Sequence, residues 1–190
     1  MDFSQKITAR VRALHESATL SFGDRVRALK KAGRDIIDLT AGEPDFDVPV
    51  SFRQGVTNAM AQGHSKYLPG RGLKELRDDI AAKLAAENNI MVDPESQVIV
   101  TPGSKQALFY AFMSLIEHGD EVLIQDPYWV SYRAMVELAG GVLKTIPTFE
   151  KEQFKITARA IKDAISVRTK VLVLVNPNNP TGTLLDRDDL

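Results

Sequence analysis

The stretch EVLIQDPYWVSYRAMVELAGGVLKTIP, residues 121–147, contains two apolar segments separated by a segment of helical length. Residues 121–125 and 142–147 are short and rich in Val, Ile and Leu, which is typical of buried strands. Residues 131–139 between them are typical of a helix. A helical crossover joins strands that run parallel, whereas antiparallel neighbours need only a short hairpin. This stretch therefore predicts a parallel sheet.

The same alternation continues on both sides of this stretch. We expect a strand at 97–101 and a helix at 104–117 before it. A helix at 158–165 and a strand at 171–175 are expected after it. Crossover helices cover both faces of a parallel sheet. The predicted class is α/β, a three-layer αβα arrangement with a mostly parallel sheet.

The first hundred residues are predicted to be mainly helical. Phe22, Val26 and Leu29 have helical spacing, and Gly33 is placed to end that helix. A short strand is expected at 36–39. Two further helices are expected, one following Pro49 with Phe52, Val56 and Met60 on one face, and one with Leu73, Leu76, Ile80 and Leu84 on one face.

Composition is that of an ordinary globular domain with one core. The chain has 190 residues, of which 44% are hydrophobic and 26% charged. Its apolar runs are too short to span a bilayer, and residues 1–6 do not resemble a secretory signal. The sequence has no Cys, which excludes a disulfide framework and favours a cytoplasmic location.

Charge and histidine placement argue against two classes of function. The formal net charge is −1, and no basic stripe is interleaved with aromatic residues, so nucleic-acid binding is not expected. His15, His64 and His118 are far apart in sequence and lack the paired spacing of metal ligands on a helix. We therefore expect no metal site.

The last residues have the pattern of a helix start. Asp186 is a good N-cap, and 187–190 carry acidic residues where the helix dipole favours them. This interrupted pattern suggests a fragment of a longer protein, although a frayed terminus stays an alternative.

Three of the predicted strands end in unusual sequences, and ligands of parallel sheets bind beyond the carboxyl ends of strands. Pro102-Gly103-Ser104-Lys105 lies at a helix start, where free N–H groups suit a phosphate. Trp129, the only Trp, follows the strand at 121–125, and NPNNPTG (176–182) follows the strand at 171–175. Taken singly, the first is more often an ordinary capped turn and the second a core anchor. Together they suit a flat phosphorylated cofactor, with a rigid Asn amide as its partner.

Five motifs in order give a more specific interpretation. They are DLTAGEPDFDVP (38–49), KYLPGRGLKELR (66–77), VTPGSKQALFYAF (100–112), DEVLIQDPYWVSY (120–132) and NPNNPTG (176–182). With these motifs the chain resembles the class I aminotransferases, which are pyridoxal-phosphate enzymes of fold type I. The similarity is strongest to the bacterial aspartate aminotransferase branch and covers essentially the whole chain.

The resemblance implies a set of cofactor-binding residues. Gly103, Ser104 and Lys105 would form the phosphate cup, mainly through backbone amides and the Ser104 hydroxyl. Trp129 would stack on the pyridine ring of pyridoxal 5'-phosphate. Asn179 would donate a hydrogen bond to the phenolic oxygen of the ring and stabilise its anion, with the flanking prolines holding Asn179 in place.

The resemblance also implies substrate contacts and a partner. Gly42 would present its backbone N–H to the substrate α-carboxylate, and Trp129 and Asn179 would also contact the substrate. Tyr67 would reach the cofactor phosphate of a neighbouring subunit, which implies a homodimer with shared active sites. The expected substrates are an amino acid and a 2-oxo acid, with aspartate and 2-oxoglutarate favoured. No nucleic acid or membrane partner is expected.

The resemblance further divides the chain and identifies what it lacks. Residues 1–48 would be an arm, a helix and a strand belonging to a small domain. Residues 49–190 would be the first part of the cofactor-binding large domain. The Schiff-base lysine, the acid that pairs with the pyridine nitrogen, and the arginine that binds the α-carboxylate would all follow Leu190, so no catalytic residue is assigned in this chain.

Two other functions stay open at this point. A carbon–sulfur lyase or a cyclase could use the same cofactor on the same scaffold. A non-catalytic, half-length paralogue would explain the missing lysine, but the cofactor-contacting residues expected in this half are all present.

Overall fold

The computed structural model describes residues 6–14, 18–40 and 42–190. It divides into two compact units, which we describe separately. The sheet unit comprises residues up to 36 together with 107–190, and the helical unit comprises 37–106. The predicted domain boundary at residue 48 stays a prediction.

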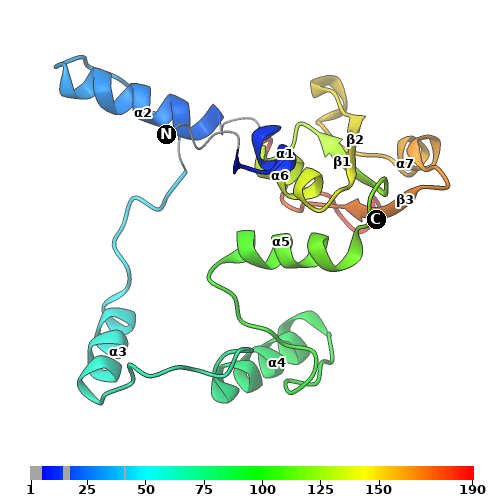
Figure 1. Cartoon of the computed structure of the whole chain (residues 1–190). Helices are drawn as coiled ribbons and strands as arrows, with labels where there is room; N and C mark the ends of the chain where they lie inside the picture. The colour runs from blue at the N-terminus through cyan, green and yellow to red at the C-terminus, as the bar shows by residue number, and fades with distance from the viewer. Residues whose placement is uncertain (1–5, 15–17, 41) are drawn as a thin grey trace. The chain divides into compact units, whose positions relative to one another are not determined.

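The sheet unit is built on three parallel strands (Figure 1). These are β1 (Glu121–Asp126), β2 (Val142–Pro147) and β3 (Thr169–Val173), in the order β2-β1-β3. Val122 pairs with Leu143 of β2 and with Val171 of β3. The predicted parallel sheet is therefore confirmed, with β1 in its centre.

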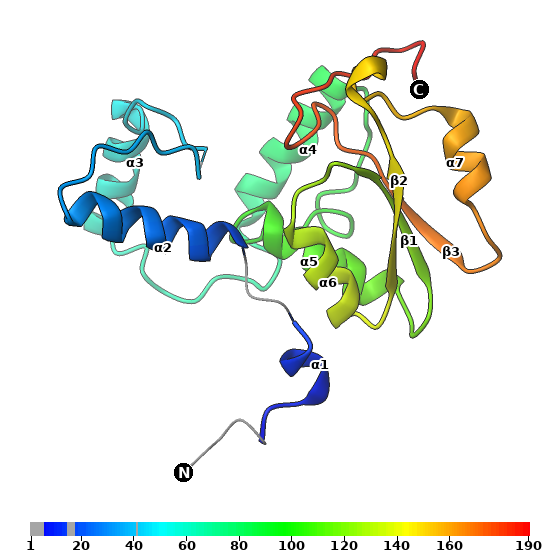
Figure 2. The same ribbon diagram turned by 90° about the horizontal axis from the view of Figure 1, so that it is seen from above.

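Helices cover the two faces of this sheet (Figure 2). Because successive side chains of a strand point to opposite faces, the fully buried β1 contributes to two cores. Val122 and Ile124 pack with Phe112 of α5 (Ser104–Leu115) and with α6 (Ser131–Leu138). On the other face, Leu123 packs with Ile146, Ile156, Leu185 and side chains of α7 (Ala158–Ala164). These are the three layers that the sequence predicts.

A buried carboxylate lies at the amino end of β1. The Glu121 side chain is 5% exposed and accepts hydrogen bonds from Ser166 Oγ at 2.7 Å and Arg168 Nη2 at 2.8 Å. Lys144 Nζ of β2 is 3.5 Å away. The Ser166 hydrogen bond is the main cause that holds the pKa of Glu121 below its ordinary range, with Arg168 and Lys144 adding to it against the opposing effect of burial. Glu121 therefore links all three strands electrostatically.

The ladder between β1 and β3 has one irregularity. Glu121 pairs with Thr169 and the next residue, Val122, pairs with Val171, so Lys170 is an extra residue on β3. This is the pattern of a β-bulge. It lets Thr169 face the Glu121 carboxylate while Val171 faces the opposite core.

Helices of the helical unit form where the sequence predicts them, but they bury little. They are α3 (Val50–Ala61) and α4 (Lys74–Asn88). No residue of α3 is buried, and α4 buries only Arg77. The Arg77 guanidinium donates to the carbonyl of Pro94 and lies 3.4 Å from Glu95 Oε2, which connects α4 to the loop that follows it.

Two predicted strands are absent from the described residues. At 36–39 the chain is irregular, and Ile37 and Leu39 are 88% and 89% exposed. At 97–101 the only described backbone hydrogen bond to a distant segment runs from Val100 N to Arg71 O at 3.0 Å. Both predictions were wrong because an apolar run shows a preference for burial, whereas a strand also needs a neighbour to complete its hydrogen-bond ladder.

Amino-terminal helices complete the described elements. They are α1 (Ala9–Arg12) and α2 (Ala18–Lys31). Gly33 ends α2 as predicted, because its φ of 80° is left-handed and lets Arg34 N reach Leu29 O at 3.1 Å. A short 3₁₀ helix, η2 (Glu150–Glu152), follows β2. Within the described part of the chain, no helix is both long and apolar enough to cross a membrane.

The final residues form a turn and not a helix. The Asp186 carboxylate accepts from the N–H groups of Asp188 and Asp189 at 3.0 and 3.1 Å, which is the hydrogen bonding expected of an N-cap. Lys155 Nζ contacts Asp189 Oδ2 at 2.6 Å, and this bond raises the pKa of Lys155. The predicted cap is confirmed, and it fixes a single turn.

Candidate functional site

The sheet brings two of the predicted site segments to one edge. Strands β1 and β3 are parallel neighbours, so their carboxyl ends lie at the same edge of the sheet. Trp129 follows β1 and the loop 176–182 follows β3. The structure therefore supports the sequence argument for these two segments.

Trp129 is held against the core by aromatic contacts. Its ring lies edge-on to Tyr132 of α6, with centroids 5.6 Å apart and an interplanar angle of 88°. Tyr132 in turn contacts Phe112 edge-on, and burial raises the pKa of Tyr132. Trp129 is only partly buried. This arrangement gives a fixed indole with some surface left for a ligand, so the anchor and the stacking interpretations are compatible.

The three asparagine side chains of the loop 176–182 differ in their hydrogen bonds and in their exposure. Asn176 exchanges two hydrogen bonds with the backbone of Leu185, both at 2.9 Å, and ties the loop to the chain that follows it. Asn178 is 5% exposed, and its Oδ1 accepts from Thr181 Oγ1 at 2.8 Å. Asn179 is exposed, and its side chain makes no hydrogen bond with the described residues. Of the three amides, the one predicted to bind a ligand is the one available for it.

At 103–105 the backbone is shaped for a close approach. Gly103 has a φ of 84°, a left-handed conformation that favours glycine, and a Cβ added there would meet nothing within 4 Å. Ser104 begins α5. The first N–H groups of an α-helix have no acceptor within the helix, and they carry the positive end of its dipole. This segment has the geometry of an anion site, although an ordinary helix start shares it.

The remaining predicted residues belong to the helical unit and are exposed. Gly42 has open space where a Cβ would be. The Tyr67 side chain is fully exposed. Residues 103–105 also belong to the helical unit, whereas Trp129 and Asn179 belong to the sheet unit. The described structure therefore brings Trp129 and Asn179 to one edge and leaves the roles of the others as predictions.

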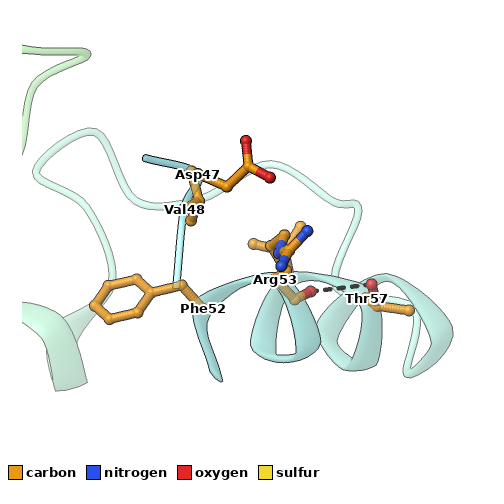
Figure 3. Close-up of a pocket in the computed structure, with 6 residues that line it drawn as sticks. Asp47, Val48, Phe52, Arg53 and Thr57 are labelled. Atoms are coloured by element: carbon orange, nitrogen blue, oxygen red, sulfur yellow. Dashed lines mark hydrogen bonds between the residues drawn. The ribbon is translucent and has the colours of Figure 1, made fainter. Parts of the chain in front are cut away.

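An open pocket of about 580 Å³ lies in the helical unit and contains none of the predicted site residues. Figure 3 shows its lining side chains at the start of α3, with Thr57 Oγ1 hydrogen-bonded to the Arg53 carbonyl at 3.0 Å. Its walls include Val48, Phe52 and Val56, which are all more than half exposed. We regard it as a hollow on an uncovered apolar face and not as the candidate site.

Metal ligands do not cluster in the described residues, where no group of three or more His, Asp or Glu side chains could hold a metal ion. His15 lies outside the residues that the structure describes.

Sequence reasoning missed the residues that support the loop 176–182. The Thr183 hydroxyl donates to the carbonyl of Gln153 at 2.8 Å, and Gln125 Nε2 of β1 lies 3.4 Å from the carbonyl of Phe154. Gln153 and Phe154 both have φ of 53°, which is left-handed and strained for residues with a Cβ. Nothing in the local sequence signals this strained pair. The threonines of the motif were a usable signal, because short hydroxyl side chains often bond to nearby backbone.

Comparison with known proteins identifies the family. The sequence model of the family "Aminotransferase class I and II" matches residues 34–190. The aspartate/prephenate aminotransferase of Thermus thermophilus is 44% identical over 184 residues, which is 97% of this chain and 48% of that protein. The aspartate aminotransferase of Geobacillus stearothermophilus is 43% identical over 97% of this chain and 47% of its own length.

Solved structures agree with the sequence comparisons. An aspartate aminotransferase from Thermus thermophilus with maleate superposes with a TM-score of 0.92 at 43% identity, covering 96% of this chain and 47% of that one. An aspartate aminotransferase from Thermotoga maritima gives a TM-score of 0.89 at 37% identity, covering 96% and 48%. The chain spans about half the length of the curated relatives it matches. The predicted fold class is confirmed, and the chain belongs to the class I and II aminotransferase family.

Proposed function

We propose that this chain is the amino-terminal part of a pyridoxal-phosphate-dependent aminotransferase that moves an amino group between an amino acid and a 2-oxo acid. The observation that carries the proposal is the family match over residues 34–190, within which all of the predicted cofactor and substrate residues lie in the quoted motifs. The names of the relatives favour aspartate as the amino donor. The resemblance carried by the sequence motifs favours 2-oxoglutarate as the acceptor. A cytoplasmic location stays a prediction.

The residues at the start of α5 are proposed to hold the cofactor phosphate. The left-handed Gly103 leaves open space for an anion, and the helix start supplies N–H groups and the favourable end of a dipole. The Ser104 hydroxyl would add a donor, and Lys105 would contribute through its backbone N–H. These observations suit a phosphate dianion.

Trp129 and Asn179 are proposed to hold the cofactor ring. Trp129 is fixed against Tyr132 and offers a flat apolar surface on which a pyridine ring can stack. Asn179 is exposed at the same edge of the sheet and its amide can donate a hydrogen bond to the phenolic oxygen of the ring. When bound, pyridoxal 5'-phosphate supplies an electron sink and a carrier for the amino group.

Other parts of the site are proposed to come from elsewhere in the enzyme. Gly42 would bind the substrate α-carboxylate through its N–H, and exposed Tyr67 would reach the phosphate in a partner subunit of a homodimer. The lysine that binds the cofactor aldehyde, the acid for the pyridine nitrogen and the α-carboxylate arginine are assigned to the part of the enzyme after Leu190. The half-length coverage of the relatives supports this assignment.

The test of the proposed function uses the complete enzyme that carries this chain. We expect stoichiometric binding of pyridoxal 5'-phosphate and formation of oxaloacetate and glutamate from aspartate and 2-oxoglutarate. Release of ammonia or sulfide without a new amino acid product would indicate a lyase and overturn the proposal. Absence of cofactor binding would favour a non-catalytic role.

Two variants test the ring-binding residues separately from turnover. Asn179→Ala removes a hydrogen bond to a charged acceptor, worth about 1.5–3 kcal/mol, so the pKa of the bound-cofactor absorbance should rise by roughly 1–2 units. Trp129→Ala should weaken cofactor binding. An unchanged titration in the first, or an unchanged cofactor affinity with only a lower Tm in the second, would contradict the assigned role.

A further inference from the structure

Asn178 is the central hydrogen-bonding residue of the loop 176–182. Its backbone N–H donates to Thr183 O at 2.8 Å, and its carbonyl accepts from Gly182 N at 2.9 Å. Its side-chain Oδ1 accepts from Thr181 N at 3.2 Å and from Thr181 Oγ1 at 2.8 Å. One buried residue thus closes the loop through both its backbone and its side chain.

Acceptors around the loop fix the directions of the two threonine hydroxyls. Asn178 Oδ1 faces the N–H of Thr181 and so is the oxygen of the amide, which can only accept. The Thr181 hydroxyl has one proton, which could also reach Thr183 Oγ1 at 3.0 Å, and the amide oxygen of Asn178 at 2.8 Å is the nearer acceptor. The carbonyl of Gln153 also only accepts, so the Thr183 proton is directed to Gln153. The loop is anchored in this way to a segment outside the motif.

The side chain of Asn178 is not explained by stability alone. Its Nδ2 is buried and has no hydrogen-bond partner among the described residues. A buried donor without an acceptor is unfavourable, and an apolar side chain of similar size would avoid it. Only a side-chain oxygen, however, can accept hydrogen bonds from both the N–H and the hydroxyl of Thr181. Asn178 therefore contributes by fixing the conformation of the loop.

Asn179 depends on this shape for its direction. It follows Asn178 directly and its exposed side chain is bonded to none of the described residues. Pro177 and Pro180 fix φ at their own positions, and Pro180 also keeps Asn179 out of the helical region. The hydrogen bonds of Asn178, Thr181 and Gly182 add to these restraints and fix the backbone on either side of Asn179.

We propose that Asn178 is a positioning residue, which together with the Thr181 hydroxyl aims the Asn179 amide at the cofactor. The inference rests on the proposed function, because it takes Asn179 as the partner of the cofactor phenolic oxygen. Nothing in it requires Asn178 to touch the cofactor or the substrate.

The experiment measures the pKa of the bound-cofactor absorbance in the complete enzyme with pyridoxal 5'-phosphate. Variants are Asn178→Ala, Thr181→Val, Thr181→Ser and Asn179→Ala. Ile116→Val serves as the stability control, because Ile116 is buried on the α5 and α6 face of the sheet, remote in sequence from the loop. Cofactor affinity and Tm are measured for every variant.

Asn178→Ala and Thr181→Val should raise the absorbance pKa, as Asn179→Ala does, but by only about 0.5–1 unit. Each substitution weakens the hydrogen bond between the Asn179 amide and the phenolic oxygen of the cofactor, whereas Asn179→Ala removes it. Thr181→Ser keeps the hydroxyl and should stay close to the unchanged enzyme. Ile116→Val should lower Tm without moving the pKa. Thr181→Val keeps the backbone bonds, so it gives an answer even if Asn178→Ala does not fold.

Two contrary results have different meanings. If Asn179→Ala shifts the pKa while Asn178→Ala and Thr181→Val only lower Tm as Ile116→Val does, the positioning role is wrong and the proposed function stands. If Asn179→Ala itself leaves the pKa unchanged, the assigned role of Asn179 fails and the positioning role of Asn178 fails with it.

Discussion

In residues 107–190 the central strand β1 is buried on both faces, whereas in residues 37–106 the only buried apolar side chain described is Val98. Both regions contain helices that the sequence predicts correctly. Helices α5, α6 and α7 have a sheet to cover, while α3 exposes Phe52, Val56 and Met60 by 60% or more. Hydrophobic periodicity therefore predicts helices correctly in both regions. A core forms only in the region where the helices can pack against strands.

This difference first predicts the behaviour of residues 1–190 expressed alone. The uncovered apolar side chains of α3 and the open edges of β2 and β3 should drive association. No transaminase turnover is expected, because the proposed function assigns the Schiff-base lysine to a later part of the enzyme. Light scattering after size-exclusion chromatography and a coupled activity assay measure the two outcomes.

Reaction with the cofactor tests directly whether this chain contains the Schiff-base lysine. Mixed with pyridoxal 5'-phosphate and reduced with borohydride, the chain should carry only scattered lysine adducts. Peptide mapping that finds one stoichiometric label, on Lys105 or any other lysine of this chain, would show that the active site has been misplaced.

Substitutions of apolar residues in the two regions should lower the free energy of unfolding by very different amounts. Ile124→Ala empties a fully buried position of β1 and should lower the free energy of unfolding by about 2–5 kcal/mol. Met60→Ala, at a position that is 71% exposed on α3, should change it by less than about 0.5 kcal/mol. Urea unfolding of the dilute chain compares them. A large cost at Met60 would show that α3 is covered in solution and would remove the contrast between the regions.

In the helical unit, the buried Arg77 connects α4 to the following loop through polar contacts with Pro94 and Glu95. Arg77→Met leaves the Pro94 carbonyl and the Glu95 carboxylate without their donor and should destabilise this unit by about 1.5–3 kcal/mol. Hydrogen exchange of the α4 amides measures the change. Lys83→Met is the matched control, because Lys83 and its ion-pair partner Glu87 are both exposed, and its cost should stay below about 1 kcal/mol. Equal exchange in the two variants would contradict the role of Arg77.

The sheet unit has its own polar anchor, and it should be sensitive to acid. The pKa of Glu121 is lower in the folded chain than its ordinary value of 4.5, so the unfolded chain binds the proton more tightly. Its stabilisation is present above pH 4.5 and is lost as the pH falls through the lowered pKa. Glu121→Gln should therefore be less stable at pH 7 and lose less stability on acidification. Exposed Glu150→Gln is the control, and identical acid slopes in both variants would contradict this prediction.

Particular residues show how far sequence analysis reached. Strand β2 was predicted with its observed bounds, and Gly33 was identified as the end of α2. The predicted strands at 36–39 and 97–101 were wrong, because sequence shows that a segment is apolar but not whether a neighbouring strand completes its ladder. In the site, the exposure of Asn179 fits its predicted role. The supporting residues Gln153 and Phe154 were missed, because their contacts join segments about thirty residues apart. Asn178 was missed although its contacts are local, because the sequence does not show which Asn of the loop is turned inward.

The extra residue Lys170 has a consequence for how the length of the chain can change during evolution. Loss of a single residue within a strand normally turns every following side chain to the opposite face. Loss of Leu172 would in this way move Val173 away from the core of Val122 and Ile124 to the opposite face of the sheet. Loss of Lys170 would instead leave Thr169 paired with Glu121 and Val171 paired with Val122 in an unbroken ladder. Position 170 is therefore the place in β3 where a one-residue deletion is best tolerated.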